Sequence, residues 1–123
     1  MRISGSEDMP MNKTLETEVN QLHAEICAGL ADPKRILILY ELAAGPRHVT
    51  ELAGSLNLNQ PLVSRHLKVL RERGMVVATR VGPAVEYRIS DMRLIQALDL
   101  LRAVLHDGLA HRASLVEKVY ETA

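Results

Sequence analysis

The sequence predicts a mainly helical domain that contains one small β-hairpin. Three of its 123 residues are Tyr and none is Phe or Trp, so the apolar residues are chiefly Leu, Val, Ile and Ala. Leu and Ala favour helices. Apolar residues recur at helical spacing along most of the chain, whereas residues 75–90 are rich in β-branched residues. The length fits one small domain, expected at residues 13–120 after a mobile arm at residues 1–12.

Two helices are expected before the first proline-containing turn. The first begins at a cap formed by Asn12 or Thr14, ends near Gly29, and carries an apolar stripe formed by Leu15, Val19, Leu22 and Ile26. Asp32-Pro33 then supplies a cap and a first-turn proline for a second helix, which ends at Gly45-Pro46.

The middle of the chain predicts two helices joined by a tight polar turn, followed by a hairpin. A short helix starts near Val49, and Asn59 caps the next helix. Residues 75–81 and 84–90 form the hairpin around Gly82-Pro83. Asp91 caps a last helix, whose continuation past Gly108 the pattern leaves open. The order α-α-α-α-β-β-α is that of a winged helix-turn-helix with an additional helix at each end.

The helix expected at residues 60–72 separates apolar from polar residues. At about 100° per residue, Val63, Leu67 and Leu70 lie within about 40° of one direction, which is the core face. The opposite side carries hydrogen-bonding groups and cations with one carboxylate, Glu72. Arginine suits guanine, glutamine suits adenine and lysine suits phosphate. We therefore expect this helix to contact DNA through Gln60, Pro61, Ser64, Arg65 and Lys68.

The hairpin extends the basic surface. The net charge of the chain is zero, but residues 61–90 hold six basic and two acidic residues, so this segment is +4. A wing of this kind reaches an adjacent minor groove or phosphate strand. We therefore add Arg80, near the hairpin tip, and Arg88 to the expected DNA contacts. His66 lies at the edge of the core face, where a packed core histidine and a DNA contact are both open.

Other classes of protein are less well supported. The single cysteine, Cys27, rules out an internal disulfide and fits a reducing cytoplasm, and no apolar run reaches the roughly 18 residues that span a bilayer. We find no nucleophile–base pair, phosphate-binding glycine loop or paired carboxylates, so we expect no enzyme. The alternative is a winged-helix module that binds proteins instead of DNA, although such a face usually exposes apolar or aromatic anchors.

Two segments of the chain read ADPKRILILYELAAG and VTELAGSLNLNQPLVSRHLKVLRERGMVVATRVGPAVEYRIS. In these segments the sequence resembles the ArsR/SmtB family of bacterial transcriptional repressors, and the resemblance covers nearly all of residues 15–106. It implies a homodimer that binds an inverted-repeat operator, with recognition helices about 34 Å apart. It also implies that the first and last helices build the dimer through two apolar stripes, formed by Leu15, Val19, Leu22 and Ile26 and by Leu94, Leu98, Leu101 and Leu105.

Neither metal-site pattern of that family is complete in this chain. The thiolate motif Cys-x-Cys-Asp-Leu is replaced by residues 48–52, which read HVTEL. The pattern on the last helix, Asp-x-His followed by His-x-x-Glu, aligns with Asp91, Arg93, Val104 and Asp107. We therefore expect no metal and no other cofactor.

Two sensor hypotheses involve the first helix. His23 and Cys27 are four residues apart on one helix face, which suits a soft or borderline metal if His106 or His111 completes the site across the dimer. Alternatively, Cys27 is a redox switch that forms a disulfide between subunits. Against both hypotheses, we expect Cys27 to be a small buried apolar residue and His23 to lie at the surface.

Overall fold

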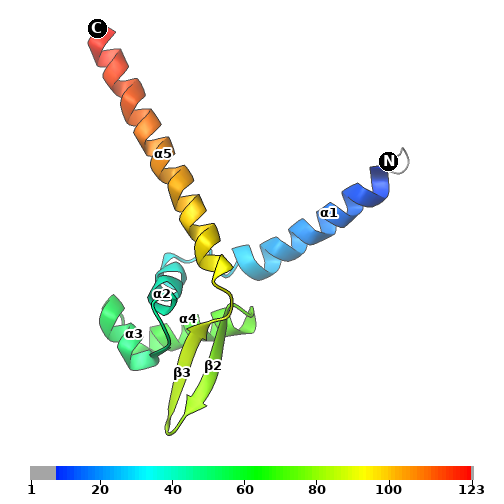
Figure 1. Cartoon of the computed structure of the whole chain (residues 1–123), viewed down its shortest axis with the longest axis vertical. Helices are drawn as coiled ribbons and strands as arrows, with labels where there is room; N and C mark the ends of the chain where they lie inside the picture. Colours follow the sequence, from blue (N-terminus) through cyan, green and yellow to red (C-terminus); the bar gives the residue numbers. More distant parts are fainter. Residues whose placement is uncertain (1–7, 123) are drawn as a thin grey trace. The chain divides into compact units, whose positions relative to one another are not determined.

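The computed structural model describes residues 8–122 and the surroundings of the side chains of residues 13–117. Its elements are α1 (Asp8–Leu22), the π-helical turn η2 (His23–Cys27), α2 (Pro33–Ala43), β1 (Arg47–His48), α3 (Val49–Leu56), α4 (Gln60–Glu72), β2 (Val76–Val81), β3 (Ala84–Ile89) and α5 (Arg93–Thr122) (Figure 1). The chain divides into two compact units, the first ending at Ser90 and the second beginning at Asp91. None of the described helices is long and apolar enough to cross a membrane.

The element order confirms the mainly helical fold with one hairpin, but the first helix begins earlier than expected. Residues 8–12, which we assigned to the terminal arm, form the first turns of α1, and residues 1–7 of that arm lie outside the described residues. The expectation that Asn12 or Thr14 caps this helix is wrong, because the helix already begins at Asp8.

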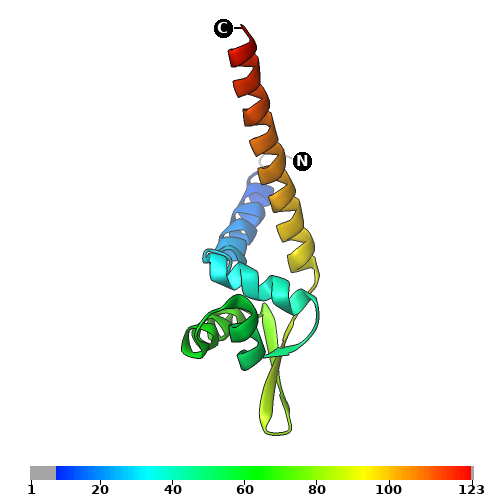
Figure 2. The ribbon, with the colours of Figure 1, turned by 90° about the vertical axis from the view of Figure 1, so that its left-hand side faces the viewer.

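Helices α2, α3 and α4 pack against one another and against the sheet. Figures 1 and 2 show these three helices gathered at the base of the β2–β3 hairpin, which extends away from them. The core of this unit is aliphatic, as the composition indicated. Its buried side chains, each at most 7% exposed, are Ile38, Leu39, Leu42, Leu52, Ala53, Val63, Leu67, Leu70, Met75 and Val76.

Side-chain caps begin α2, α4 and α5 where the sequence predicted them. The carboxylate of Asp32 accepts a hydrogen bond from the backbone N–H of Lys34 at 2.8 Å, and the side-chain oxygen of Asn59 accepts one from Leu62 at 2.9 Å. The carboxylate of Asp91 accepts one from the N–H of Arg93 at 2.9 Å. Each cap satisfies a backbone donor that the first turn of a helix leaves unpaired.

The sheet has three antiparallel strands in the order β1-β3-β2. Its hairpin closes between Val81 and Ala84, which are paired across the two-residue Gly82-Pro83 turn. Gly82 has φ +61°, a conformation that glycine adopts readily at the first position of such a turn. The sequence did not predict β1, because two residues carry no detectable periodicity and their pairing partners lie in β3, far along the chain.

The second unit is dominated by α5, one continuous helix of 30 residues (Figure 1). This settles the question left open at Gly108, which lies inside the helix. A single glycine in a long helix costs about 1 kcal/mol relative to alanine, which the flanking helix-forming residues can outweigh.

Two glycines provide a matched test of the backbone. Gly54 lies inside α3, whereas Gly74 follows α4 with φ +72°, and a Cβ added to either meets no atom within 4 Å. We expect Gly54→Ala to raise the free energy of unfolding by about 0.5–1 kcal/mol, because alanine is the better helix former. We expect Gly74→Ala to lower it by about 1–2 kcal/mol, because a Cβ is strained in the left-handed region. Urea denaturation followed by circular dichroism measures both, and shifts of the same sign would contradict this reading.

Candidate nucleic-acid interface

The two sides of α4 differ in exposure as its sequence predicted. Val63, Leu67 and Leu70 are fully buried in the core of the first unit. All five residues that we assigned to DNA contact on this helix are exposed. We call these five residues the reading face: Gln60, Pro61, Ser64, Arg65 and Lys68.

The hairpin places its two expected DNA-contact residues on opposite faces. Arg80 pairs with Val85 across the hairpin, and Arg88 pairs with Val77. Paired residues share a face and side chains alternate along a strand, so Arg80 lies on the same face as Val85 and Tyr87. Both of those residues line a cavity that also reaches α4. The structure therefore brings Arg80 to the α4 side of the hairpin and leaves Arg88, which is exposed, on the other side.

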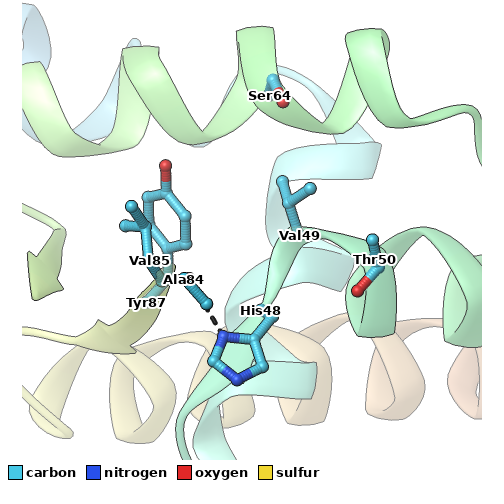
Figure 3. Close-up of a pocket in the computed structure, with 7 residues that line it drawn as sticks. All are labelled: His48, Val49, Thr50, Ser64, Ala84, Val85 and Tyr87. Carbon is cyan, nitrogen blue, oxygen red and sulfur yellow. Dashed lines mark hydrogen bonds between the residues drawn. The ribbon is translucent and has the colours of Figure 1, made fainter. Parts of the chain in front are cut away.

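The cavity next to the reading face has a volume of about 400 Å³ and lies between the start of α3, α4 and β3 (Figure 3). Its described lining residues include no carboxylate and carry three hydroxyl groups, those of Thr50, Ser64 and Tyr87. Figure 3 shows the Tyr87 ring between β3 and α4, with its hydroxyl directed toward α4. The remaining lining residues are His48, Val49, Ala84 and Val85.

One hydrogen bond ties the wall of this cavity together. His48 Nδ1 lies 3.1 Å from the carbonyl oxygen of Val85, and because a carbonyl only accepts, Nδ1 carries the proton and donates. The backbone N–H of His48 donates to the carboxylate of Glu51 at 2.8 Å, which fixes the start of α3. This leaves Thr50 exposed in the first turn of α3, facing the cavity.

Sequence reasoning missed Thr50 and Tyr87 as residues beside the reading face. Two weak signals were present: Thr50 stands in the first turn of a helix, and Tyr87 alternates with Val85 along the expected strand. Neither signal identifies a surface without knowing that α3 and β3 both lie next to α4.

His66 is a core histidine, which decides between the two roles left open for it. It is 7% exposed, and its Nδ1 lies 3.4 Å from a guanidinium nitrogen of Arg35. Since arginine only donates, Nδ1 is the acceptor and the proton of the neutral ring is on Nε2. That atom is 3.9 Å from the Asp32 carboxylate and finds no hydrogen-bond partner among the described residues.

Burial lowers the pKa of His66 below its ordinary value of 6.5, and the positive charges of Arg35, Lys34 and Arg65 lower it further. The carboxylate of Asp32 acts in the opposite direction without cancelling these effects. His66 is therefore held neutral inside the unit that carries the reading face.

The possible sensor residues lie at the end of the first helix. His23 and Cys27 are the first and last residues of η2, and both are exposed. The expectation that Cys27 is buried is therefore wrong for the single chain: Ile26, Ala28, Gly29 and Leu30 face neighbouring atoms, and Cys27 does not. The expectation that His23 lies at the surface is confirmed.

Metal-ligating residues do not cluster in the described part of the chain. No group of three or more His, Cys, Asp or Glu side chains there is placed to hold a metal ion. At the start of α5, the guanidinium of Arg93 binds the carboxylate of Asp91, with its closest contact at 2.6 Å. These hydrogen bonds, from the side chain and backbone of Arg93, lower the pKa of Asp91 to about 2. The donor set at this position does not fit the family's metal site.

The two apolar stripes differ in exposure along their length. Leu15, Val19 and Leu22 on α1 and Leu101 and Leu105 on α5 are each between 49% and 61% exposed. Ile26 and Leu94 are half-buried, and Leu98 is only 4% exposed.

Comparison with known proteins identifies relatives that cover most of the chain. A family model described as "Bacterial regulatory protein, arsR family" matches residues 32–77, from the cap of α2 into β2. The HTH-type transcriptional regulator NmtR of Mycobacterium tuberculosis is 36% identical over 97 residues, which cover 79% of each chain. The HTH-type transcriptional repressor SmtB of the same species is 41% identical over 91 residues, covering 74% of this chain and 66% of that protein.

A solved structure confirms the winged helix-turn-helix fold. It is the homodimeric winged helix-turn-helix DNA-binding domain of a possible ArsR-family transcriptional regulator from Mycobacterium bovis. The TM-score is 0.68 at 30% sequence identity, and the match covers 78% of this chain and 88% of that chain.

The neutral state of His66 predicts acid sensitivity. Its pKa is lower in the folded chain than in the unfolded one, so the unfolded state binds more protons as pH falls below about 6.5. We expect the free energy of unfolding, measured by urea denaturation at a series of pH values, to fall between pH 7.5 and 5.5. His66→Asn should flatten this dependence, whereas His106→Asn, an exposed position on α5, should leave it unchanged. An equally steep profile in His66→Asn would show that other groups cause the acid sensitivity.

Proposed function

The chain belongs to the arsR family of bacterial regulatory proteins, and we propose that it represses transcription as a homodimer bound to an inverted-repeat operator. The observation that carries this proposal is the exposure of the whole reading face on a helix whose other side is fully buried. A helix held in this way presents its polar side chains as a fixed ridge of the size that fits the major groove.

Each side chain of the reading face has a chemistry that suggests its role. The forked guanidinium of Arg65 suits two hydrogen bonds to guanine, and the amide of Gln60, at the start of α4, suits adenine. Lys68 is a point charge that suits a phosphate. Arg80 lies on the face of the hairpin that lines the cavity, and from there it is proposed to contact a second phosphate or the minor groove.

The cavity beside the reading face suits the DNA backbone. Val49, Ala84 and Val85 offer apolar surface to a deoxyribose, and the hydroxyl groups of Thr50 and Tyr87 can donate to phosphate oxygens. These contacts position the duplex without reading its sequence.

Dimerisation follows from the exposed leucine stripes. A domain of this size buries only about two-thirds of its unfolded surface, and the exposed stripe residues, such as Leu15 and Leu101, add burial when a second copy covers them. A two-fold axis then places the two reading faces on successive turns of one side of the DNA, which is why the operator is an inverted repeat.

The releasing signal is not a metal at either family position, because those donor sets are incomplete and Arg93 already binds the Asp91 carboxylate. The proposed site of action is the bacterial cytoplasm, where the chromosomal DNA lies. A protein-binding role has less support, because the reading face carries no aromatic or large aliphatic side chain.

Replacing Arg65 tests base reading. The probe is the DNA upstream of the protein's own gene, compared with a scrambled duplex in a fluorescence anisotropy titration at near-physiological salt. We expect Arg65→Ala to weaken binding to the upstream DNA by about 1–3 kcal/mol and to change binding to the scrambled duplex far less.

Thr50→Val is the matched control for this experiment, since it removes a hydroxyl group that is proposed to contact only the backbone. Its affinity for both duplexes should fall by similar factors. Unchanged upstream binding in Arg65→Ala would remove this residue from the proposed site, and equal binding of the wild-type protein to both duplexes would contradict a sequence-specific repressor.

Leu101→Glu tests the dimer. It places a charge on the exposed stripe of α5, and burying that charge against a second chain costs several kcal/mol, so we expect monomers in analytical ultracentrifugation. Leu100 is 70% exposed and lies about 100° around the helix from Leu101, away from the stripe, so Leu100→Glu should remain dimeric. A Leu101→Glu protein that is still a dimer at micromolar concentration would exclude this stripe from the interface.

A further inference from the structure

We propose that Arg35 and Arg73 are positioning residues that hold the end of the first helix against α4 and thereby set the half-site spacing that the dimer accepts. This inference rests on the proposed function, in which α1 joins the two subunits and α4 reads DNA. Neither arginine belongs to the reading face, and both bind backbone carbonyls at the end of the first helix.

The first attachment comes from the end of α4. Arg73 is the C-terminal cap residue of α4, and its guanidinium donates a hydrogen bond to the carbonyl oxygen of Ala24 in η2. This bond joins residues 49 positions apart in the sequence. It links the last turn of the recognition helix directly to the last turn of the first helix.

The second attachment comes from α2 and reaches the middle of α4. Arg35 Nε donates to the carbonyl oxygen of Gly29 at 2.7 Å, and one of its terminal nitrogens donates to that of Ala28 at 3.2 Å. Its other terminal nitrogen lies 3.4 Å from Nδ1 of the buried His66 on α4. A planar guanidinium has donors in fixed directions, so these three partners hold one geometry.

In the turn after η2, the backbone at Gly29 lies close to the side chains that follow α4. Gly29 is buried, and a Cβ at this position would lie 2.7 Å from Met75 Sδ and 3.1 Å from Arg73 Cδ. A larger residue at this position would require the Met75 and Arg73 side chains to shift, so glycine favours this close approach of the backbone. The end of the first helix is therefore joined to α4 by hydrogen bonds through Arg35 and Arg73, and Gly29 approaches the side chains of Arg73 and Met75 just after α4.

These contacts also match the charge at the end of the helix. The last carbonyls of a helix lack partners within it and carry the negative end of its dipole. The two guanidiniums donate to carbonyls at this end of the helix and bring the opposite charge, and the Ala28 carbonyl also accepts a hydrogen bond from the N–H of Ala31. Rotating the first helix on α4 would separate Ala24, Ala28 and Gly29 from these donors.

Two-fold symmetry enlarges the effect of this link on DNA binding. If α1 lies at the dimer axis, a change in its angle to α4 moves both reading faces at once, in opposite directions. Adding one base pair between half-sites shifts them by about 3.4 Å and rotates them by about 34°. The hydrogen bonds from Arg35 and Arg73 hold the angle between α1 and α4, so the dimer should reject an altered spacing. Without these bonds the angle can change, and the dimer should accept other spacings.

The test compares Arg73→Ala with Arg71→Ala. Arg71 is exposed in the last turn of α4, so its replacement removes the same charge from the same end of the helix. Each dimer is titrated with the operator found by footprinting the upstream DNA, and with versions whose half-site spacing is changed by −1, +1 and +2 base pairs. An isolated half-site duplex is the reference.

We expect the wild-type protein and Arg71→Ala to bind the native spacing at least about tenfold more tightly than the altered spacings. This is the size of the affinity loss caused by one mismatched base pair in a binding site. Arg73→Ala should bind the four spacings within about threefold of one another and keep its half-site affinity. A protein that only lost stability would lose affinity on every duplex without changing the ranking of the spacings.

Arg35→Lys is the second variant, used alongside Arg73→Ala in case that protein is poorly folded. It keeps the charge but cannot bind two carbonyls and His66 in one plane, so it should also flatten the spacing preference. Spacing discrimination equal to wild type in a folded, dimeric Arg73→Ala or Arg35→Lys would overturn the inference. Failure of the wild-type protein to prefer the operator over a scrambled duplex would overturn the proposed function and this inference with it.

Discussion

The burial of one side of α4 is the constraint on which the rest of the structure depends. Val63, Leu67 and Leu70 are anchored among residues of α2, α3 and β2, and this fixes the rotation of α4 about its own axis. Rotating α4 so that Lys68 and Arg71 faced the core would bury unpaired cations, which costs several kcal/mol of the small free energy that holds a domain together. The apolar residues on the buried side therefore fix the direction in which the polar side chains of the reading face point.

The features that the sequence predicted correctly depend on residues that are close together in the chain. The two faces of α4 follow from apolar residues seven and fewer positions apart, and the caps Asp32, Asn59 and Asp91 each act on a backbone donor two or three residues away. The hairpin was visible because Gly82-Pro83 separates two runs of β-branched residues. Physical rules that act within a few residues can be applied without knowing the fold.

The features that were missed depend on residues far apart in the sequence. Strand β1 exists because Arg47 and His48 meet Tyr87 and Glu86, and the cavity at the reading face joins α3, α4 and β3. The exposure of Cys27 was mispredicted because its burial depends on what covers η2, which helical spacing does not indicate. His66 was left between two roles, and only the positions of Asp32 and Arg35 decided it.

The ion pair between Asp91 and Arg93 gives the start of α5 a tethered counter-ion. Here the partner is attached two residues away, so its local concentration is set by the chain itself. The hydrogen bonds from Arg93 lower the pKa of this carboxylate to about 2, so it is ionised at neutral pH beside a guanidinium of the same chain. The start of α5 thus carries a positive and a negative charge that the chain itself keeps two residues apart.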